Sequence, residues 1–232
     1  MAKLCIEDLT CLDMFAHLRE ETLEKMCNLG IKKSVVKGEH IFRDKEKEEN
    51  IYVVLSGKVS LYKINESSQK RVIFILGREK IVNEVILDDL PASVSCEVFE
   101  DGEVLCFNRN KFIDIMRDDF ELTTRVINSL AKKVRRTYRQ LKNATPIKME
   151  KRVAAKLWKL CKDYGVEKEY GTLIDLNISI TYLADMFGTP RETISRAMKV
   201  LQQNNLVKVQ RKQIIIPEPE KLIKYFKEIG KN

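Results

Sequence analysis

Hydrophobic positions follow two different periods along the chain. From about residue 31 to 107 the apolar runs are short, often alternate with polar residues, and are separated by turn signals, which is typical of β-strands. We expect strands at 51–55 and 59–62 around a tight turn at Ser56-Gly57, a buried strand at 71–76, and a hairpin over 97–107 with Asp101-Gly102 at its tip. Strands at this spacing favour a sandwich or barrel over a parallel sheet.

From residue 119 to 141 the period becomes helical. Five residues recur at alternating steps of three and four and form one seam: Ile127, Leu130, Val134, Thr137 and Leu141. Lys and Arg residues flank this narrow seam, and a narrow seam on a long helix predicts a two-chain coiled coil. The segment 143–146, Asn-Ala-Thr-Pro, then ends the helix and predicts a hinge.

The chain after the hinge predicts three helices. The first runs from 147 to about 162 and is followed by a loop over 163–171. Residues 179–187 predict a short amphipathic helix capped by Ser179 or Thr181. Gly188-Thr189-Pro190 predicts a turn with Thr189 as N-cap and Pro190 at the first helical position, and residues 191–203 predict the last helix of this group.

This last helix has a clear division between its faces. Apolar residues Ile194, Met198 and Leu201 point to its partner helix, which leaves four polar residues exposed on its first turns: Arg191, Glu192, Ser195 and Arg196. A helix, a glycine turn and a helix with polar residues at its start present side chains to a DNA major groove. Residues 206–209 and 213–216 flank a basic turn at 210–212, which predicts a hairpin like a DNA-binding wing.

Charge divides the chain in the same way as the periodicity. Residues 1–130 contain 19 Lys and Arg against 24 Asp and Glu, whereas residues 131–232 contain 23 basic and 10 acidic residues. A step of this size indicates an acidic domain joined to one that binds a polyanion. A solvated basic face is the alternative that composition alone leaves open.

Several classes of protein are not expected. The longest stretch without a charged residue is 176–184, far short of the ~20 residues that span a bilayer, and the first fifteen residues lack a signal-peptide core. We therefore expect a cytoplasmic protein with no membrane partner, whose six cysteines are reduced thiols or metal ligands. No phosphate-binding loop or zinc-protease motif occurs, so we do not expect an enzyme.

Four segments together resemble one known family, the Crp/Fnr transcription regulators. Residues 37–42 (Lys-Gly-Glu-His-Ile-Phe) and 51–59 (Ile-Tyr-Val-Val-Leu-Ser-Gly-Lys-Val) are similar to its opening β-roll strands. Residues 189–196 (Thr-Pro-Arg-Glu-Thr-Ile-Ser-Arg) resemble its recognition helix, and residues 212–216 resemble its wing. The resemblance extends over nearly the whole chain.

The resemblance implies an α+β fold with three parts. These are a cyclic-nucleotide-binding-like β-roll as sensor domain (1–118), a long dimerisation helix (119–143) and a C-terminal winged helix-turn-helix (144–232). It implies a homodimer that binds an inverted-repeat operator in double-stranded DNA and acts together with RNA polymerase.

The resemblance also assigns roles to residues of the recognition helix. Glu192 and Arg196 match the pair that reads a G·C core in each half-site, while Ser195 and Arg191 match two different branches of the family. These matches favour a half-site containing TTG or TGTGA. Thr181, Lys199 and Lys212 are interpreted as phosphate contacts, which position a protein without specifying sequence.

The effector of the sensor domain is left open. Glu84 lies where cAMP-binding members have a ribose-binding Glu, but Pro91-Ala92-Ser93 stands where their phosphate-binding Arg belongs. Because a cyclic phosphate would lose its bidentate partner, cAMP is not the expected ligand. The candidate pocket residues are Glu84, Ser93 and Thr137, although Thr137 fits the helical seam equally well.

Two alternatives remain. Cys5 and Cys11 have the spacing of two ligands in the family's iron-sulfur oxygen sensors, and Cys106 aligns with a distant ligand, but a cluster needs four thiolates and small buried side chains explain the cysteines as well. Haem is a further possibility without a supporting motif. A regulatory subunit that uses the β-roll to control a partner protein would not need the recognition helix or the wing.

Overall fold

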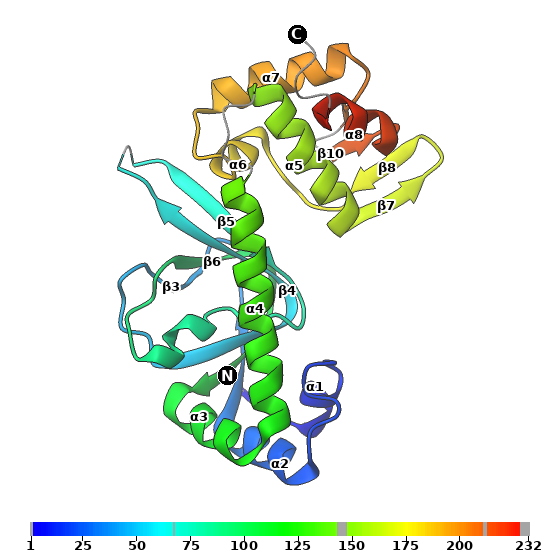
Figure 1. Ribbon diagram of the computed structural model, residues 1–232. Coiled ribbons are helices and arrows are strands. Elements are labelled where there is room, and N and C mark those ends of the chain that lie inside the picture. Colours follow the sequence, from blue (N-terminus) through cyan, green and yellow to red (C-terminus); the bar gives the residue numbers. More distant parts are fainter. Residues whose placement is uncertain (1, 67, 143–147, 211–212, 228–232) are drawn as a thin grey trace. The chain divides into compact units, whose positions relative to one another are not determined.

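The computed structural model describes residues 2–66, 68–142, 148–210 and 213–227 (Figure 1). The chain forms two compact units, one with residues 1–63 and 72–142, the other with residues 64–71 and 143–232. The long helix is part of the first unit. The division of the chain at 118/119 and 143/144 stays a prediction, and residues 143–146 of the expected hinge lie outside the described residues.

The N-terminal part of the chain is a sheet with helices before and after it. Its elements are β1 (Ala2–Lys3), α1 (Ile6–Thr10), α2 (Glu20–Leu29), β2 (Gly30–Val35), β3 (His40–Phe42), β4 (Asn50–Ile64), β5 (Lys70–Leu76), the 3-10 helix η1 (Glu84–Asp88), β6 (Ser95–Asn108), α3 (Arg109–Asp118) and α4 (Phe120–Lys142). The strands are ordered β1-β2-β6-β4-β5, with β3 also paired to β6. The pairs β1–β2, β2–β6, β3–β6 and β4–β6 are antiparallel, and the expected β-roll is confirmed.

Two expected turns are wrong. Residues 50–64 form one continuous strand rather than two strands around Ser56-Gly57, and residues 95–108 form another. The register between β4 and β6 shifts at Ser56 and Lys58, so the glycines mark bulges where both strands bend. Gly57 has a φ of 72°, and a Cβ on Gly102 would lie 2.1 Å from the carbonyl oxygen of Ser56. Two backbones can approach this closely only without side chains.

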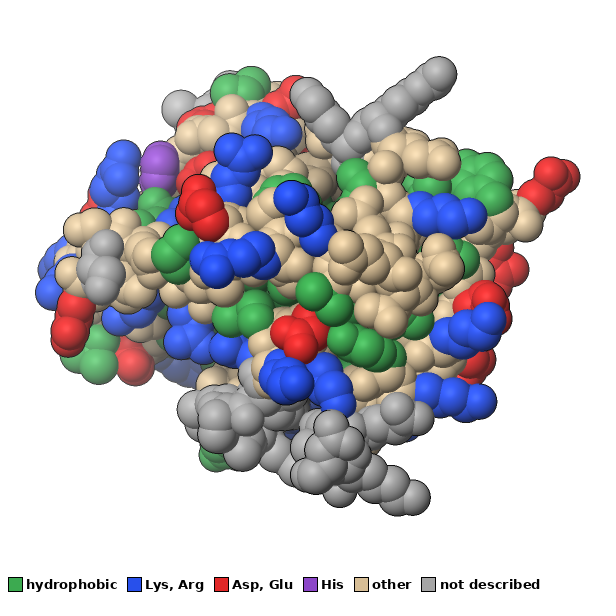
Figure 2. Space-filling model, turned by 90° about the horizontal axis from the view of Figure 1, so that it is seen from above, with side chains coloured by type: hydrophobic (Ala, Val, Ile, Leu, Met, Phe, Trp, Pro, Cys, Tyr) green, Lys and Arg blue, Asp and Glu red, His purple; other side chains and the backbone are tan. Residues whose placement is uncertain are grey.

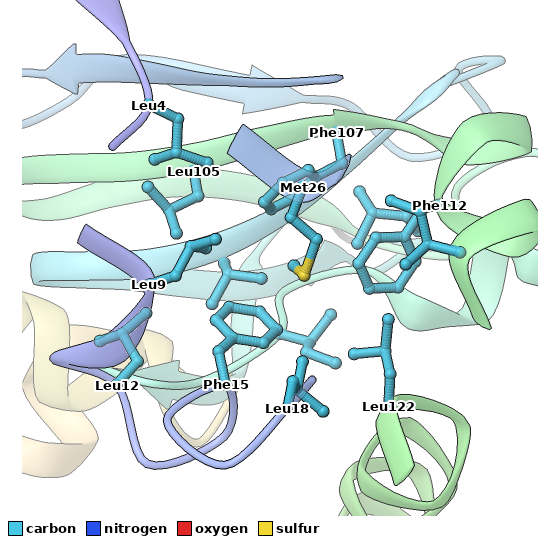
Figure 3. Close-up of a cluster of buried hydrophobic side chains, with 14 of the residues drawn as sticks. Leu4, Leu9, Leu12, Phe15, Leu18, Met26, Leu105, Phe107, Phe112 and Leu122 are labelled. Atoms are coloured by element: carbon cyan, nitrogen blue, oxygen red, sulfur yellow. The ribbon is translucent and has the colours of Figure 1, made fainter. Parts of the chain in front are cut away.

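One core cluster joins the helices to the sheet (Figure 3). Its labelled side chains come from the N-terminal segment, α2, β6, α3 and α4, and they point toward one another: Leu4, Leu9, Leu12, Phe15, Leu18, Met26, Leu105, Phe107, Phe112 and Leu122. The rings of Phe107 and Phe112 lie 5.5 Å apart. Because Leu122 is fully buried in this cluster, the first turn of α4 is held by apolar packing.

Asp119 fixes the point at which α4 begins. Its carboxylate is buried and accepts hydrogen bonds from the backbone amides of Glu121 (3.0 Å) and Leu122 (3.3 Å), as an N-cap residue does. The other oxygen accepts from the hydroxyl of Thr22 (2.6 Å) and from Arg19 (3.4 Å). Burial alone would raise the pKa of Asp119, but these hydrogen bonds lower it overall.

The C-terminal part contains a small sheet and four helices among the described residues. Its elements are α5 (Met149–Tyr164), β7 (Gly165–Lys168), β8 (Gly171–Ile174), α6 (Ile180–Asp185), α7 (Arg191–Gln203), β9 (Lys208–Gln210), β10 (Gln213–Ile216) and α8 (Pro219–Lys227). The sheet order is β7-β8-β10-β9.

This sheet changes one expectation and confirms another. The expected loop at 163–171 is wrong, because β7 and β8 form an antiparallel hairpin there. The residues of β7 are all exposed and mostly polar, so they lack the alternation of apolar and polar positions that predicts a strand. Gly171, with a φ of 125°, ends the turn between the two strands. The hairpin of β9 and β10 is confirmed as an antiparallel pair. None of the helices within the described ranges is both long enough and apolar enough to pass through a lipid bilayer.

Asp119→Ala should lower the free energy of unfolding by about 1–2 kcal/mol, because it removes the N-cap of α4. Asp119→Asn keeps a capping oxygen and should cost less. The pKa of Asp119 is lower in the folded protein than in the unfolded chain. Its negative charge therefore stabilises the fold at a pH above the pKa of the unfolded chain, and this stabilisation is lost as the pH falls through the pKa of the folded protein. Urea titrations should show the wild-type advantage over Asp119→Asn shrinking toward pH 3. An advantage that is the same at pH 7 and pH 3 would contradict this role.

Candidate nucleic-acid interface and ligand cavity

Helices α6 and α7 form the expected helix-turn-helix. Ser179 caps α6 by accepting a hydrogen bond from the amide of Tyr182 (3.0 Å), and Gly188 takes a left-handed φ of 59° in the turn. The start of α7 differs by one position from the expectation. Pro190, not Thr189, occupies the N-cap position, and the helix begins at Arg191.

The two faces of α7 differ as expected. Ile194, Ala197, Met198 and Leu201 are buried against the unit. Arg191, Glu192 and Arg196 are exposed and Ser195 is half-buried. The Nε of Arg196 donates only a long hydrogen bond of 3.4 Å to the carbonyl oxygen of Glu192, so the Nη edge of its exposed guanidinium faces solvent, where it can donate to an external acceptor pair.

The expected phosphate contacts lie on the same unit. Thr181 is exposed in the first turn of α6, and Lys199 is exposed on α7. Lys212 lies outside the described residues. Figure 2 shows Lys and Arg side chains at several places on the face that it draws, with Asp and Glu side chains among them. The excess of 23 basic over 10 acidic residues in 131–232 favours binding to a polyanion.

The N-terminal unit contains a cavity of about 400 Å³ between the sheet and α4. Its lining residues are Phe42, Leu61, Ile73, Phe74, Val82, Asn83, Val85, Ala92, Ser93, Val94, Leu130, Lys133, Val134, Thr137 and Tyr138. Ser93 and Thr137, two of the expected pocket residues, belong to this wall. The third, Glu84, does not, because its carboxylate turns to α4.

Glu84 is held by two residues of α4. Lys133 forms a salt bridge with it, and the hydroxyl of Ser129 donates a hydrogen bond of 2.7 Å. The amino group of Lys133 also donates to the carbonyl oxygens of Ile81 (2.9 Å) and Val82 (3.0 Å). Burial lowers the pKa of Lys133, and the Glu84 carboxylate opposes this effect.

Lys133 is the residue that the sequence interpretation missed. Its charge placed it with the solvated residues that flank the seam, yet its side chain is only 18% exposed, and that of Glu84 is fully buried. A signal was present in the spacing. Lys133 follows the buried Val126 by seven residues, so it lies on the face of α4 that packs against the sheet.

The predicted seam on α4 is divided between two faces. Ile127 and Val134 are 55% and 45% exposed, and Thr137 is exposed as well. Leu130 is half-buried and lines the cavity, and the side chain of Leu141 lies outside the described residues. The exposed apolar residues form a stripe that we call the α4 stripe: Phe120, Ile127, Val134 and Tyr138.

The cysteines give no geometric support to a metal site. Cys5 and Cys11 are exposed at the two ends of α1, whereas Cys106 is half-buried in β6, where burial raises the pKa of its thiol. Metal ligation needs the thiolate, so this shift disfavours binding. Within the part of the chain that the structure describes, no three His, Cys, Asp or Glu side chains are grouped so as to hold a metal ion.

Comparison with known protein families matches both units. The model of the cyclic nucleotide-binding domain matches residues 32–119. The model of the Crp-like helix-turn-helix domain matches residues 151–225. The two matches cover the sheet that forms the cavity and the helices that carry the exposed polar residues.

Individual relatives are similar over most of the chain. A CRP-like cAMP-activated global transcriptional regulator of Mycobacterium tuberculosis is 21% identical over 187 residues, 80% of this chain and 84% of the relative. The anaerobic regulatory protein of Bacillus subtilis is 23% identical over 194 residues, 83% and 82% of the two chains. The c-di-GMP-responsive global regulator CLP of Xanthomonas campestris shares the fold, with a TM-score of 0.77, 20% identity, and coverage of 86% and 100%.

Breaking the Lys133–Glu84 pair should destabilise the N-terminal unit strongly. Lys133→Met or Glu84→Leu should each cost about 3–5 kcal/mol, because each leaves a buried charge without its partner. The double variant Lys133→Met/Glu84→Leu should recover most of this loss, since it removes both groups. Calorimetric unfolding of the four proteins measures the coupling.

The matched control is Lys132→Met, which removes an exposed charge one residue away on α4 and should change stability little. If the double variant loses as much stability as the sum of the two single variants, the pair is not coupled and the assignment is wrong.

Proposed function

The chain belongs to the Crp/Fnr family of DNA-binding transcriptional regulators, and from this premise we propose that it is a homodimer that reads an inverted-repeat operator under the control of an effector. The observation that carries the proposal is α7, whose exposed Arg191, Glu192 and Arg196 lie opposite a fully buried face. As a regulator of transcription it acts in the cytoplasm, with double-stranded DNA and RNA polymerase as partners.

The chemistry of α7 gives a mechanism for reading bases. The guanidinium of Arg196 donates two hydrogen bonds to O6 and N7 of guanine, a geometry that Lys does not reproduce. Glu192 accepts from N4 of cytosine, and Arg191 and Ser195 contact neighbouring bases. Thr181, Lys199 and Lys212 bind phosphates and set the register. These residues favour half-sites containing TTG or TGTGA.

The α4 stripe supports the homodimer. Phe120, Ile127 and Val134 are spaced by seven residues and are exposed in the single chain. A stripe with this period is buried when two parallel helices form a coiled coil. A dimer made in this way presents two copies of α7 to one face of DNA, with half-sites about one helical turn apart.

The alternatives have less support. The names of the relatives refer to cAMP, anaerobic regulation and c-di-GMP, so membership of the family does not fix the effector. An iron-sulfur cluster would need four thiolates, and no three candidate ligands are grouped among the described side chains. A regulatory subunit that acts only on a partner protein leaves the exposed polar face of α7 without a role.

Arg196→Ala should cost about 1–3 kcal/mol of binding free energy per half-site, because it removes a bidentate base contact. The preference for guanine should be lost at one base pair of each half-site, while the base preferences at the other positions should not change. Binding-site selection with wild-type and variant protein measures both effects.

Lys199→Ala is the control on the same helix. Because Lys199 is expected to contact a phosphate, the variant should bind all DNA sequences more weakly by the same factor. The slope of log binding constant against log salt concentration should fall in magnitude by about 0.9. If Arg196→Ala also loses affinity uniformly, with no position relaxed, then Arg196 contacts the backbone rather than a base.

Ile127→Glu/Val134→Glu should convert the dimer to monomers, because two carboxylates would face their copies across the stripe. The monomers should also lose operator binding, since one recognition helix contacts only half of the site. Light scattering at micromolar concentration and a mobility-shift assay measure the two effects.

Lys132→Glu/Arg139→Glu places the same carboxylates on exposed positions of α4 outside the stripe, and these proteins should remain dimeric. A stripe variant that is still dimeric would show that the subunits associate through another surface.

A further inference from the structure

The cavity under α4 has a wall made almost entirely of hydrocarbon. Of its fifteen lining residues, eleven are apolar or aromatic and come from the sheet, from the segment after it and from α4. At about 400 Å³ it falls within the usual range for sites that enclose a small molecule. A wall of this composition favours ligands whose surface is mainly apolar.

The charged residue of the cavity wall already has partners. Lys133 is bound to Glu84 and to two carbonyl oxygens. Arg136, which lies over the ring of Phe74, 5.0 Å from its centre, is not a lining residue of the cavity. A phosphate or carboxylate placed in the cavity would be desolvated without gaining a cation of its own, which is unfavourable.

Two polar side chains of the wall, Asn83 and Thr137, already form hydrogen bonds within the protein. The side chain of Asn83 accepts from the amide of Tyr52 (3.0 Å) and donates to the carbonyl oxygen of Asn50 (2.8 Å). The hydroxyl of Thr137 donates to the carbonyl oxygen of Lys133 (3.1 Å). This leaves the exposed hydroxyls of Ser93 and Tyr138 to contact a polar atom of the ligand.

The wall also connects the cavity to the α4 stripe. Leu130, Val134, Thr137 and Tyr138 of α4 all line the cavity, and Val134 and Tyr138 are exposed members of the stripe. A ligand in the cavity therefore contacts the helix that we propose to join the two subunits.

We propose that this cavity binds an uncharged, largely apolar small molecule with a single polar group directed to Ser93 or Tyr138, in place of a cyclic nucleotide. The proposal rests on the regulator function above, since it names the class of its effector. The ligand bridges the sheet and α4 by apolar contacts, while Lys133 and Glu84 supply the polar contact between the same two elements.

The test uses N-phenyl-1-naphthylamine, a neutral probe whose fluorescence rises in apolar surroundings, titrated into the full-length protein. We expect saturable binding of one probe per chain, with no displacement by cAMP. Ser93→Phe, which narrows the cavity at an exposed position, should weaken binding by about tenfold or more. Val36→Phe, at another exposed position outside the wall, should bind the probe like the wild type.

A second pair of variants tests the charge argument at one position. Thr137→Val should keep the affinity for the probe, whereas Thr137→Asp should reduce it by about tenfold or more, because the ligand would then lie against a carboxylate. Phe120→Ser removes the most exposed residue of the α4 stripe and should leave binding unchanged, which separates the cavity from the stripe.

The proposal is overturned if the probe does not bind, if Ser93→Phe binds it as well as the wild type, or if cAMP displaces it. The mobility-shift assay with Arg196→Ala reports on the regulator function independently. Probe binding that fails while operator binding persists refutes the effector class alone, and operator binding that fails while the probe still binds refutes the regulator function.

Discussion

The buried contact between Lys133 and Glu84 determines how the long helix lies on the sheet. A charged amino group without water needs several oxygen partners, and here one carboxylate and two carbonyl oxygens supply them. These acceptors follow β5 in the chain, in the segment 81–84, whereas the donor comes from the middle of α4. A rotation of the helix by one residue, about 100°, would turn Lys133 away and leave the buried carboxylate of Glu84 without its partner.

Because this ion pair fixes the rotation of α4, the other residues of the helix fall on three faces: one in the core, one against the cavity and one exposed. With Lys133 and Ser129 turned to Glu84, Leu122 and Val126 lie in the core cluster and Leu130 lies against the cavity. Phe120, Ile127 and Val134 are then exposed. The ion pair thus fixes which apolar residues of α4 are buried, which line the cavity and which are exposed, and Val134 and Tyr138 do both of the last two.

The C-terminal unit depends on a more local arrangement. Ile194, Met198 and Leu201 bury one face of α7, and Gly188 allows the tight turn before it. The polar residues of the first two turns are consequently presented on a rigid helix rather than on a loop. Recognition of bases needs this rigidity, because a bidentate contact depends on the orientation of the whole guanidinium plane.

The sequence by itself determined the features that depend on neighbouring residues. The helix at 191–203 and its buried face follow from periodicity and turn residues within a short segment, and the structure has both. The same local pattern offered Ser179 and Thr181 as caps of the preceding helix, and the structure uses Ser179. The spacing of the strands favoured only a sandwich or barrel, and the β-roll was expected from the resemblance to a family. Tertiary structure decided the rest. The sequence predicted turns at Gly57 and Gly102. In the structure both glycines lie at bulges, because β4 and β6, which are far apart in the sequence, pair and bend at the same place. Lys133 read as a solvated charge, since its partner Glu84 lies 49 residues away and only folding brings the two groups together.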